Sequence, residues 1–304
     1  MSYNMTQYNQ DQWDYVNYLI KEHKKVFFKF GFNKKKFIEY LFNDQMGYRF
    51  DINNPKTFNE KINAFKYNYK KKGRIFSNLT DKNKVREYVK AKIGEQYLIP
   101  QLLFKKKITV DDLEKLPNSF VIKTNNGSGT NYIVKDKSKE DLNKLCNYMN
   151  NLLKIKYQYI WGEFHYGDIK PGIVVDELKV DKEGNLPYDL KCFCFNNNGK
   201  KHKVYFIDRV IGDDRCRKWI DEDWNEIEIK SQFTRLDVDI KKPKNYKDIF
   251  RVIDILSEDF NFVRVDLFLL DNKIYFGELT FTPTAGYLKF DDDVTDKMWG
   301  EWIG

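Results

Sequence analysis

The spacing of hydrophobic positions changes near residue 120, and the change separates a helical first part of the chain from a strand-rich second part. In the first part, apolar residues recur at helical intervals behind a T-x-x-E capping box at 57–60. A second helix is expected to follow Asp81 and to end at Gly94, where glycine commonly ends helices. A short apolar strand follows over 97–104.

Beyond residue 120, short apolar runs predict strands that alternate with a few amphipathic helices. The expected strands are 120–123, 132–134, 173–177, 189–195 and 204–209, followed by a long hairpin over 262–281. The expected helices are 138–154, capped by Ser138, then 246–260 and a terminal helix after Asp291. The pattern indicates an α+β protein with a mainly helical N-terminal region and mostly antiparallel strands.

Composition narrows the class of protein. Hydrophobic residues make up 41% and aromatic residues 16% of 304 positions, which supplies a packed core and excludes a disordered chain. The mean hydropathy is −0.68 and no uncharged apolar run approaches the length of a membrane span. The polar segment 1–12 does not resemble a secretory signal. Four cysteines do not form a disulfide framework in a chain of this length, so we expect a cytoplasmic protein.

The charge is basic, with 53 Lys and Arg against 45 Asp and Glu, a net charge of +8. Such a balance suggests a nucleic-acid partner. Alanine, however, occurs only at Ala64, Ala91 and Ala285, while Lys, Asn, Ile, Phe and Tyr are abundant, as in proteins from AT-rich genomes. The lysine runs are short and separated by ordered-looking sequence. We therefore interpret most of the lysines as solvated surface and expect no nucleic-acid partner.

A glycine-rich loop joins the first two strands of the second part, in the segment VIKTNNGSGTNYIV. Gly127 and Gly129 permit positive φ, and successive backbone N–H groups in such a loop cradle anions. Ser128 and Thr130 add hydroxyl groups, and Lys123 precedes the loop. The alternative is an ordinary hairpin turn, although six or seven polar residues exceed the two that a minimal turn needs. A P-loop is excluded because its lysine motif and following helix are missing.

The hairpin over 262–281 carries charged residues at the end away from its turn. If residues 271–273 form a three-residue turn, the register places Asp266 directly opposite Glu278. Opposed carboxylates have Cβ atoms about 4.5–5.5 Å apart and repel each other. A two-residue turn would instead send the two carboxylates to opposite faces of the hairpin.

A divalent cation would turn this repulsion into a binding site. The same register places Arg264 opposite Thr280, so one face carries two carboxylates, a hydroxyl and a guanidinium. Carboxylate oxygens suit Mg²⁺, which usually keeps water and phosphate as further ligands. The alternative is a solvent-facing hairpin with incidental charges.

The combination of a phosphate-binding loop, a strand lysine and a later carboxylate hairpin resembles the ATP-grasp arrangement. More specifically, the chain resembles the TupA-like ATP-grasp family of bacterial polysaccharide gene clusters over roughly residues 30–290. The segments that carry the resemblance are PKTFNEK at 55–61, DKNKVREY at 81–88, FVIKTNNGSGT at 120–130 and VRVDLFLLDNKIYFGELTFTP at 263–283. The resemblance implies an ATP-grasp fold, in which two α/β subdomains grip ATP. Its expected parts are an N-terminal helical region at 1–107, a lid subdomain at 108–178 and a core subdomain at 179–304.

The resemblance also implies which residues bind ATP. These are Lys123, Gly127, Ser128, Gly129, Thr130, Glu177, Leu178 and Asp189. Lys123 and the glycine-rich loop would contact the phosphates. Glu177 and the backbone at Leu178 would bind the adenine edge, and Asp189 would hold the ribose.

Further roles implied by the resemblance concern catalysis and metal binding. The catalytic cations would be Lys191, Arg209 and Arg264. The ligands of Mg²⁺ would be Asp266, Glu278 and Thr280. Thr280 stands where many ATP-grasp enzymes have asparagine, so one ligand would be weaker and a second metal is in question.

The implied function is an ATP- and Mg²⁺-dependent ligase that forms an amide through an acyl phosphate. The implied partners are a nucleotide sugar or glycan that bears a uronic acid carboxylate and an amino acid or other amine, in capsule or O-antigen biosynthesis. An ATP-dependent sugar kinase and a non-catalytic glycan- or nucleic-acid-binding module are the alternatives.

Two lesser signals remain. In the aromatic segment 161–166, Glu163 or His165 would serve as a base in an acceptor pocket, or the segment is a packed aromatic loop. Cys192 and Cys194 lie on one side of a strand without zinc-like spacing to another pair, so we expect core thiols.

Overall fold

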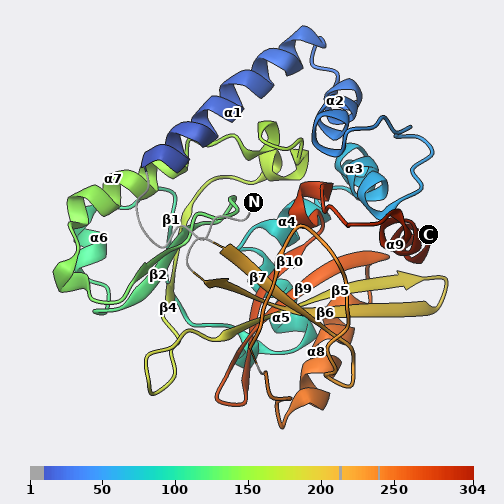
Figure 1. Cartoon of the computed structure of the whole chain (residues 1–304). Coiled ribbons are helices and arrows are strands. Elements are labelled where there is room, and N and C mark those ends of the chain that lie inside the picture. The colour runs from blue at the N-terminus through green and yellow to red at the C-terminus, as the bar shows by residue number, and fades with distance from the viewer. Residues whose placement is uncertain (1–9, 212–213, 239) are drawn as a thin grey trace. The chain divides into compact units, whose positions relative to one another are not determined.

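Two sheets organise the computed structural model, which describes residues 10–211, 214–238 and 240–304 (Figure 1). One compact unit contains the described part of Met1–Leu41 with Lys66–Arg86 and Ile99–Leu178. The other contains Phe42–Phe65, Glu87–Leu98 and Lys179–Gly304. The α+β class expected from the sequence is confirmed, whereas the three-part division at 107 and 178 stays a prediction.

The first unit is built on a four-stranded antiparallel sheet with the order β1-β4-β2-β3. Its strands are β1 (Gln101–Lys105), β2 (Phe120–Thr124), β3 (Tyr132–Val134) and β4 (Ile173–Glu177). Its helices are α1 (Gln10–Lys29), most of α2 (Lys34–Met46), α4 (Ile75–Thr80), α6 (Val110–Glu114) and α7 (Leu142–Leu152), with the start of α5 (Val85–Lys92). Alternate residues of β2 pack with one face of α7 in a common core, which includes Phe120, Ile122, Leu145 and Met149.

The start of α7 differs from the expectation. Asp141, not Ser138, is the N-cap, and its carboxylate accepts a hydrogen bond from the Lys144 N–H at 3.0 Å. Ser138 lies in a 3₁₀ turn over Lys137–Lys139. Aspartate and serine are both good N-caps, so local sequence alone did not choose between them.

The second unit is built on a six-stranded sheet with the order β10-β9-β5-β6-β7-β8, antiparallel except for the β7–β8 pair. Its strands are β5 (Tyr188–Asn197), β6 (Lys200–Ile211), β7 (Asp214–Ile220), β8 (Thr234–Arg235), β9 (Phe262–Leu270) and β10 (Lys273–Thr280). Its helices include most of α3 (Phe58–Asn68), α8 (Tyr246–Ser257) and α9 (Asp293–Ile303). At the start of α3, Thr57 Oγ1 accepts from the Glu60 N–H at 3.3 Å, as the capping box predicts.

Helices cover the two faces of this sheet differently. Helix α8 packs on the face that carries Tyr205, whose ring lies 5.0 Å from that of Phe250. On the opposite face, Phe193 packs against Phe58 of α3 and Trp299 of α9. Strand alternation places Lys191 on this second face too, beyond the end of its aromatic cluster. One half of the face is therefore a hydrophobic core and the other half is charged.

The hairpin of β9 and β10 brings Asp266 opposite Glu278, as expected, but by a different route. Its turn has two residues, Asp271 and Asn272, both with positive φ, and not the predicted three. A β-bulge between Phe276 and Glu278 then restores the register. The predicted three-residue turn was wrong, and the pairing of the two carboxylates is correct because the bulge lies between them and the turn.

Gly277 occupies this bulge, and an alanine there is expected to lower the free energy of unfolding by about 1–3 kcal/mol. An added Cβ would lie 2.9 Å from the backbone oxygen of Asp266, which cannot move away as a side chain can. Chemical denaturation measures the effect. Gly167→Ala is the control, because its nearest neighbour is the flexible Gln158 side chain at 3.2 Å. Equal denaturation midpoints in the two variants would contradict the prediction.

No helix in the described ranges is both long enough and apolar enough to span a bilayer. Cys146, Cys192, Cys194 and Cys216 are buried and not in disulfides.

Candidate functional site

The glycine-rich loop of the first unit is anchored at both ends. Thr124 Oγ1 lies 2.9 Å from Thr130 Oγ1, and the Asn125 amide donates to Asp81 Oδ1 at 3.0 Å. A Cβ at Gly127 would lie 2.5 Å from Thr124 Oγ1, and Gly129 has a φ of +69°. Gly129 is therefore required by its backbone conformation, and Gly127 by close packing against the side chains of Thr124 and Tyr157. The loop is longer and better anchored than a minimal hairpin turn.

Lys123 pairs with a residue that sequence reasoning missed. Its Nζ lies 2.7 Å from Asp176 Oδ2 in the neighbouring strand β4, and the Arg86 guanidinium is 3.9 Å from the same carboxylate. The register places Glu177 on the opposite face of the sheet from Lys123 and Asp176. The signal for Asp176 was its position in β4, directly after three apolar residues and one residue before Glu177.

The second unit contains a cluster of paired charges on the open half of the sheet face described above, called here the charged cluster. Its members are Asp189, Lys191, Arg264, Asp266, Glu278 and Thr280. Lys191 Nζ lies 2.7 Å from both Asp189 and Asp266. The structure thus brings together six residues that the sequence singled out, from three adjacent strands.

Arg264 is the centre of this cluster. Its Nε donates to Asp266 Oδ1 at 2.6 Å, and its Nη2 donates to Asp266 Oδ2 at 2.7 Å. The same Nη2 lies 2.9 Å from Glu278 Oε1 and 2.9 Å from Thr280 Oγ1. Burial would lower the pKa of Arg264, but Asp266 and Glu278 outweigh it and raise that pKa. The Arg264 guanidinium therefore stays protonated.

Lys191 and Asp189 are influenced by burial and by each other. Burial would lower the pKa of Lys191, but Asp189 and Asp266 outweigh it and raise that pKa. Burial raises the pKa of Asp189, and the neighbouring Lys191 opposes this rise. The ammonium of Lys191 thus stays charged next to two carboxylates.

Three further charged residues lie on the same face, and the sequence did not reveal them. Asp208 accepts from Arg217 Nε at 2.8 Å and from Arg215 Nε at 3.0 Å. The Arg217 guanidinium carbon lies 3.9 Å from the ring centroids of both Phe206 and Phe233. Burial would raise the pKa of Asp208, but Arg217 and Arg215 outweigh it and lower that pKa.

Arg209 does not join the charged cluster. Asp208 faces Asp189, so the next residue along the strand points to the opposite face of the sheet. There the Arg209 guanidinium lies 4.6 Å from the ring centroid of Tyr188. Its catalytic role stays a prediction.

Glu163 and His165 are both buried in the first unit. They lie near Lys66, which is fully buried and donates to the Trp161 carbonyl at 2.9 Å. Burial lowers the pKa of Lys66 to about 7, with Glu163 opposing the shift. Burial, together with the charge of Lys66, lowers the pKa of His165 to about 3. Their role in an acceptor pocket stays a prediction.

The low pKa of His165 predicts a loss of stability in acid. The folded protein holds the imidazole neutral, whereas the unfolded chain takes up a proton below a pKa of about 6.5. The contribution of the neutral His165 imidazole to the free energy of unfolding is complete above that pH. It is lost as the pH falls toward the pKa of about 3 that His165 has in the folded protein. His165→Gln should reduce the dependence of unfolding free energy on pH by up to about 1.4 kcal/mol per pH unit between about pH 6 and 4. Denaturant titrations at both pH values measure this, and identical slopes in both proteins would refute it.

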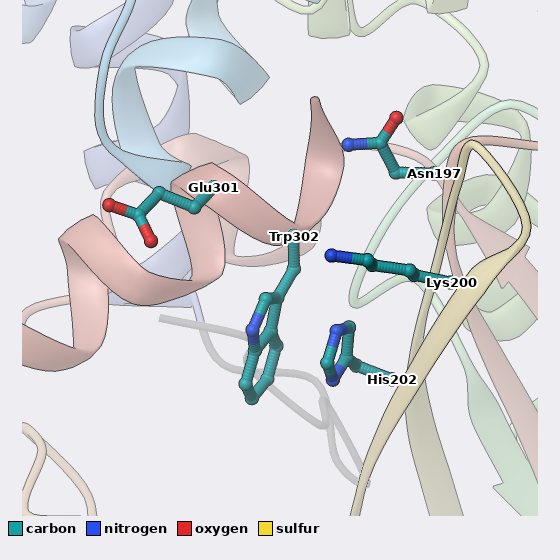
Figure 2. Close-up of a pocket in the computed structure, with 5 residues that line it drawn as sticks. All are labelled: Asn197, Lys200, His202, Glu301 and Trp302. Carbon is teal, nitrogen blue, oxygen red and sulfur yellow. The ribbon is translucent and has the colours of Figure 1, made fainter.

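A separate open pocket of about 360 Å³ lies in the second unit, where the β5–β6 turn meets α9 (Figure 2). Its lining residues are Asn197, Lys200, His202, Glu301 and Trp302. The imidazole of His202 stacks on the indole of Trp302, with 4.3 Å between centroids. None of the residues predicted for the active site lines this pocket.

A glycine-rich loop after a strand lysine, and paired carboxylates on adjacent antiparallel strands, are the features that the sequence resemblance associates with ATP-grasp proteins. Comparison with protein families agrees, because the family described as TupA-like ATPgrasp matches residues 60–304. The chain belongs to the TupA-like ATP-grasp family. The expected family and its ATP-grasp fold are thereby confirmed.

Solved structures with similarity to the chain include D-alanyl-alanine synthetase A from Vibrio cholerae, at 18% identity and a TM-score of 0.41, covering 67% of this chain and 56% of that one. The D-alanine–D-alanine ligase from Bacillus anthracis complexed with ATP has 15% identity and a TM-score of 0.39, covering 67% and 54%. The ATP-grasp ligase PsnB, complexed with minimal precursor, has 9% identity and a TM-score of 0.39, covering 76% and 62%. The chain thus spans little more than half the length of the first two. A search of curated proteins found no match.

Proposed function

We propose that this protein is an ATP- and Mg²⁺-dependent ligase that joins a carboxylate to an amine through an acyl phosphate. Family membership supports the reaction class. The observation that carries the proposal is the convergence of oxygens from Asp266, Glu278 and Thr280 on one point, which a single nitrogen of Arg264 contacts at 2.7–2.9 Å. Three hard oxygen donors around one cationic position match the preference of Mg²⁺.

The protein supplies few ligands for the proposed metal. In residues 10–211, 214–238 and 240–304, no group of three or more His, Cys, Asp or Glu side chains has the arrangement of a metal site. A metal held by Asp266 and Glu278, with the Thr280 hydroxyl, would thus take its other ligands from water and substrate phosphates, as Mg²⁺ usually does. The bound ion would neutralise charge on the phosphates.

We assign the loop of the first unit to the phosphates of ATP. The backbone N–H groups of Gly127 and Gly129, the hydroxyls of Ser128 and Thr130 and the Lys123 ammonium supply donors. Glu177 and the backbone at Leu178 are assigned to adenine, and Asp189 to the ribose. The anchoring of the loop through Thr124 and Asn125 supports its assignment, because a preorganised anion site loses less entropy on binding.

The proposed reaction has two steps. A substrate carboxylate oxygen attacks the γ-phosphorus, the bond from that phosphorus to the β,γ-bridging oxygen breaks, and ADP leaves. An amine then attacks the acyl carbon, inorganic phosphate leaves, and the amine nitrogen loses a proton. Lys191 and Arg264 would stabilise negative charge on the transferred phosphoryl group by hydrogen bonds that strengthen as charge develops.

Family resemblance also supports the finer assignment of substrates. We propose a uronic acid carboxylate of a nucleotide sugar or glycan as the acid, an amino acid or similar amine as the nucleophile, and capsule or O-antigen biosynthesis as the setting. We propose a cytoplasmic location, because four free thiols suit a reducing compartment.

A coupled assay of ADP release tests the proposal across a panel of uronic acid nucleotides and amines. Release of ADP and phosphate that requires both an acid and an amine is the expected result. Release with a sugar alone and without phosphate would identify a kinase. Absence of ADP with every pair, in a protein that still binds glycans, would favour a non-catalytic binding module.

A further inference from the structure

Arg264 occupies the position at which the proposed metal ligands converge. One nitrogen, Nη2, contacts oxygens of Asp266, Glu278 and Thr280, all within 2.9 Å. Lys191 Nζ contacts one of these three oxygens, Asp266 Oδ2, at 2.7 Å and otherwise pairs with Asp189, whereas Arg264 Nη2 contacts all three. The guanidinium is thus the group that a divalent cation must displace.

Displacing the Arg264 guanidinium from the carboxylates costs free energy, because Arg264 is largely buried, with 11% of its side chain exposed. Both oxygens of Asp266 already accept hydrogen bonds from cations, so the carboxylate does not need a metal to be neutralised. A guanidinium that leaves the carboxylates without gaining another anion would be a buried unpaired charge, which is costly. A triphosphate offers that anion, and arginine binds phosphate in bidentate geometry.

We propose that Arg264 is an internal counter-cation of the metal site, which couples divalent-cation binding to nucleotide binding. This inference rests on the proposed function. Without nucleotide, Arg264 holds Asp266 and Glu278 and weakens the binding of a bare divalent cation. With nucleotide, it transfers to phosphate and leaves the carboxylates to the metal. Because such coupling is reciprocal, the metal should strengthen nucleotide binding by the same factor.

Mn²⁺ binding measured by electron paramagnetic resonance, with and without a non-hydrolysable ATP analogue, tests the inference. In the wild type, the analogue should tighten Mn²⁺ binding at least about tenfold, within the range of known coupling energies. Arg264→Gln removes the charge and should bind Mn²⁺ at least about tenfold more tightly than the wild type without nucleotide. Arg264→Lys keeps a cation and should resemble the wild type. Arg251→Gln, an exposed arginine of α8, is the matched control.

Thermal unfolding provides a second measurement if Arg264→Gln is unstable, because this variant leaves Asp266 and Glu278 facing each other without that guanidinium. Mn²⁺ alone should raise its melting temperature, and should do so much less in the wild type. Equal Mn²⁺ affinity of both proteins without nucleotide would overturn the inference. The proposed function would survive that result if Asp266→Asn abolished nucleotide-dependent Mn²⁺ binding. No Mn²⁺ binding by any of the proteins, with or without nucleotide, would overturn both.

Discussion

Asp266→Asn is expected to reduce ADP release by at least about 1000-fold, because it removes one of the two carboxylates proposed to bind Mg²⁺. Asparagine keeps the size of the side chain and one oxygen acceptor but loses the charge. Asp266 is 2% exposed, so solvent cannot replace the lost charge. The variant also leaves Lys191 and Arg264 with one anion fewer. The coupled assay at saturating ATP and high Mg²⁺ measures the loss.

The same hairpin offers a matched control. Asp271 is exposed in the two-residue turn and has a positive φ, which asparagine tolerates well. Asp271→Asn should therefore keep activity within about twofold of the wild type. Circular dichroism and melting curves show whether Asp266→Asn is folded. If the Asp266→Asn variant were folded and had nearly wild-type turnover, the assignment of Asp266 and Glu278 as metal ligands would be wrong.

The hairpin of β9 and β10 was predicted correctly in part from the sequence. The pairing of Asp266 with Glu278 was predicted correctly, although the turn was assigned three residues and has two. Two errors cancelled, because the unrecognised bulge at Gly277 shifts the register by the residue that the turn lacks. A glycine within a strand is a signal for a bulge. Close approach of the Asp266 backbone explains why glycine is needed there.

The cluster around Asp208 could not be predicted in the same way. Asp189, Asp208 and Arg217 belong to three strands, and their register depends on two connections of unknown geometry. A shift of one residue decides whether Asp208 or Arg209 faces the charged cluster. The family resemblance drew attention to Arg209, and the structure places Asp208 on that face instead. The sequence shows that successive residues of β6 point to opposite faces of the sheet. It does not show which of the two faces Asp208 is on.

Asp208→Ala is expected to lower the free energy of unfolding by about 3–5 kcal/mol, the range for breaking a buried ion pair from one side. Its carboxylate is the hydrogen-bond acceptor of Arg217, which is 4% exposed and held between two aromatic rings. Without Asp208, the guanidinium would be a buried charge without its acceptor. Denaturant unfolding of the purified variants measures this change. Glu226→Ala is the control. Its nearer partner, Arg235, is 67% exposed, and such a pair contributes about 1 kcal/mol or less. Its second partner, Lys218 at 3.4 Å, still donates to the Val238 carbonyl without it.

The double variant Asp208→Ala/Arg217→Met separates a structural role from a functional one. Methionine fills the space between Phe206 and Phe233 without a charge, so most of the lost stability should return. If ADP release returns with it, the Asp208–Arg217 pair serves the fold of the sheet. If stability returns and activity does not, the pair contributes charge to the reaction on the face it shares with Lys191. Should Asp208→Ala cost no more than Glu226→Ala, the burial argument itself would be wrong, because an unpaired guanidinium in this environment cannot be without cost.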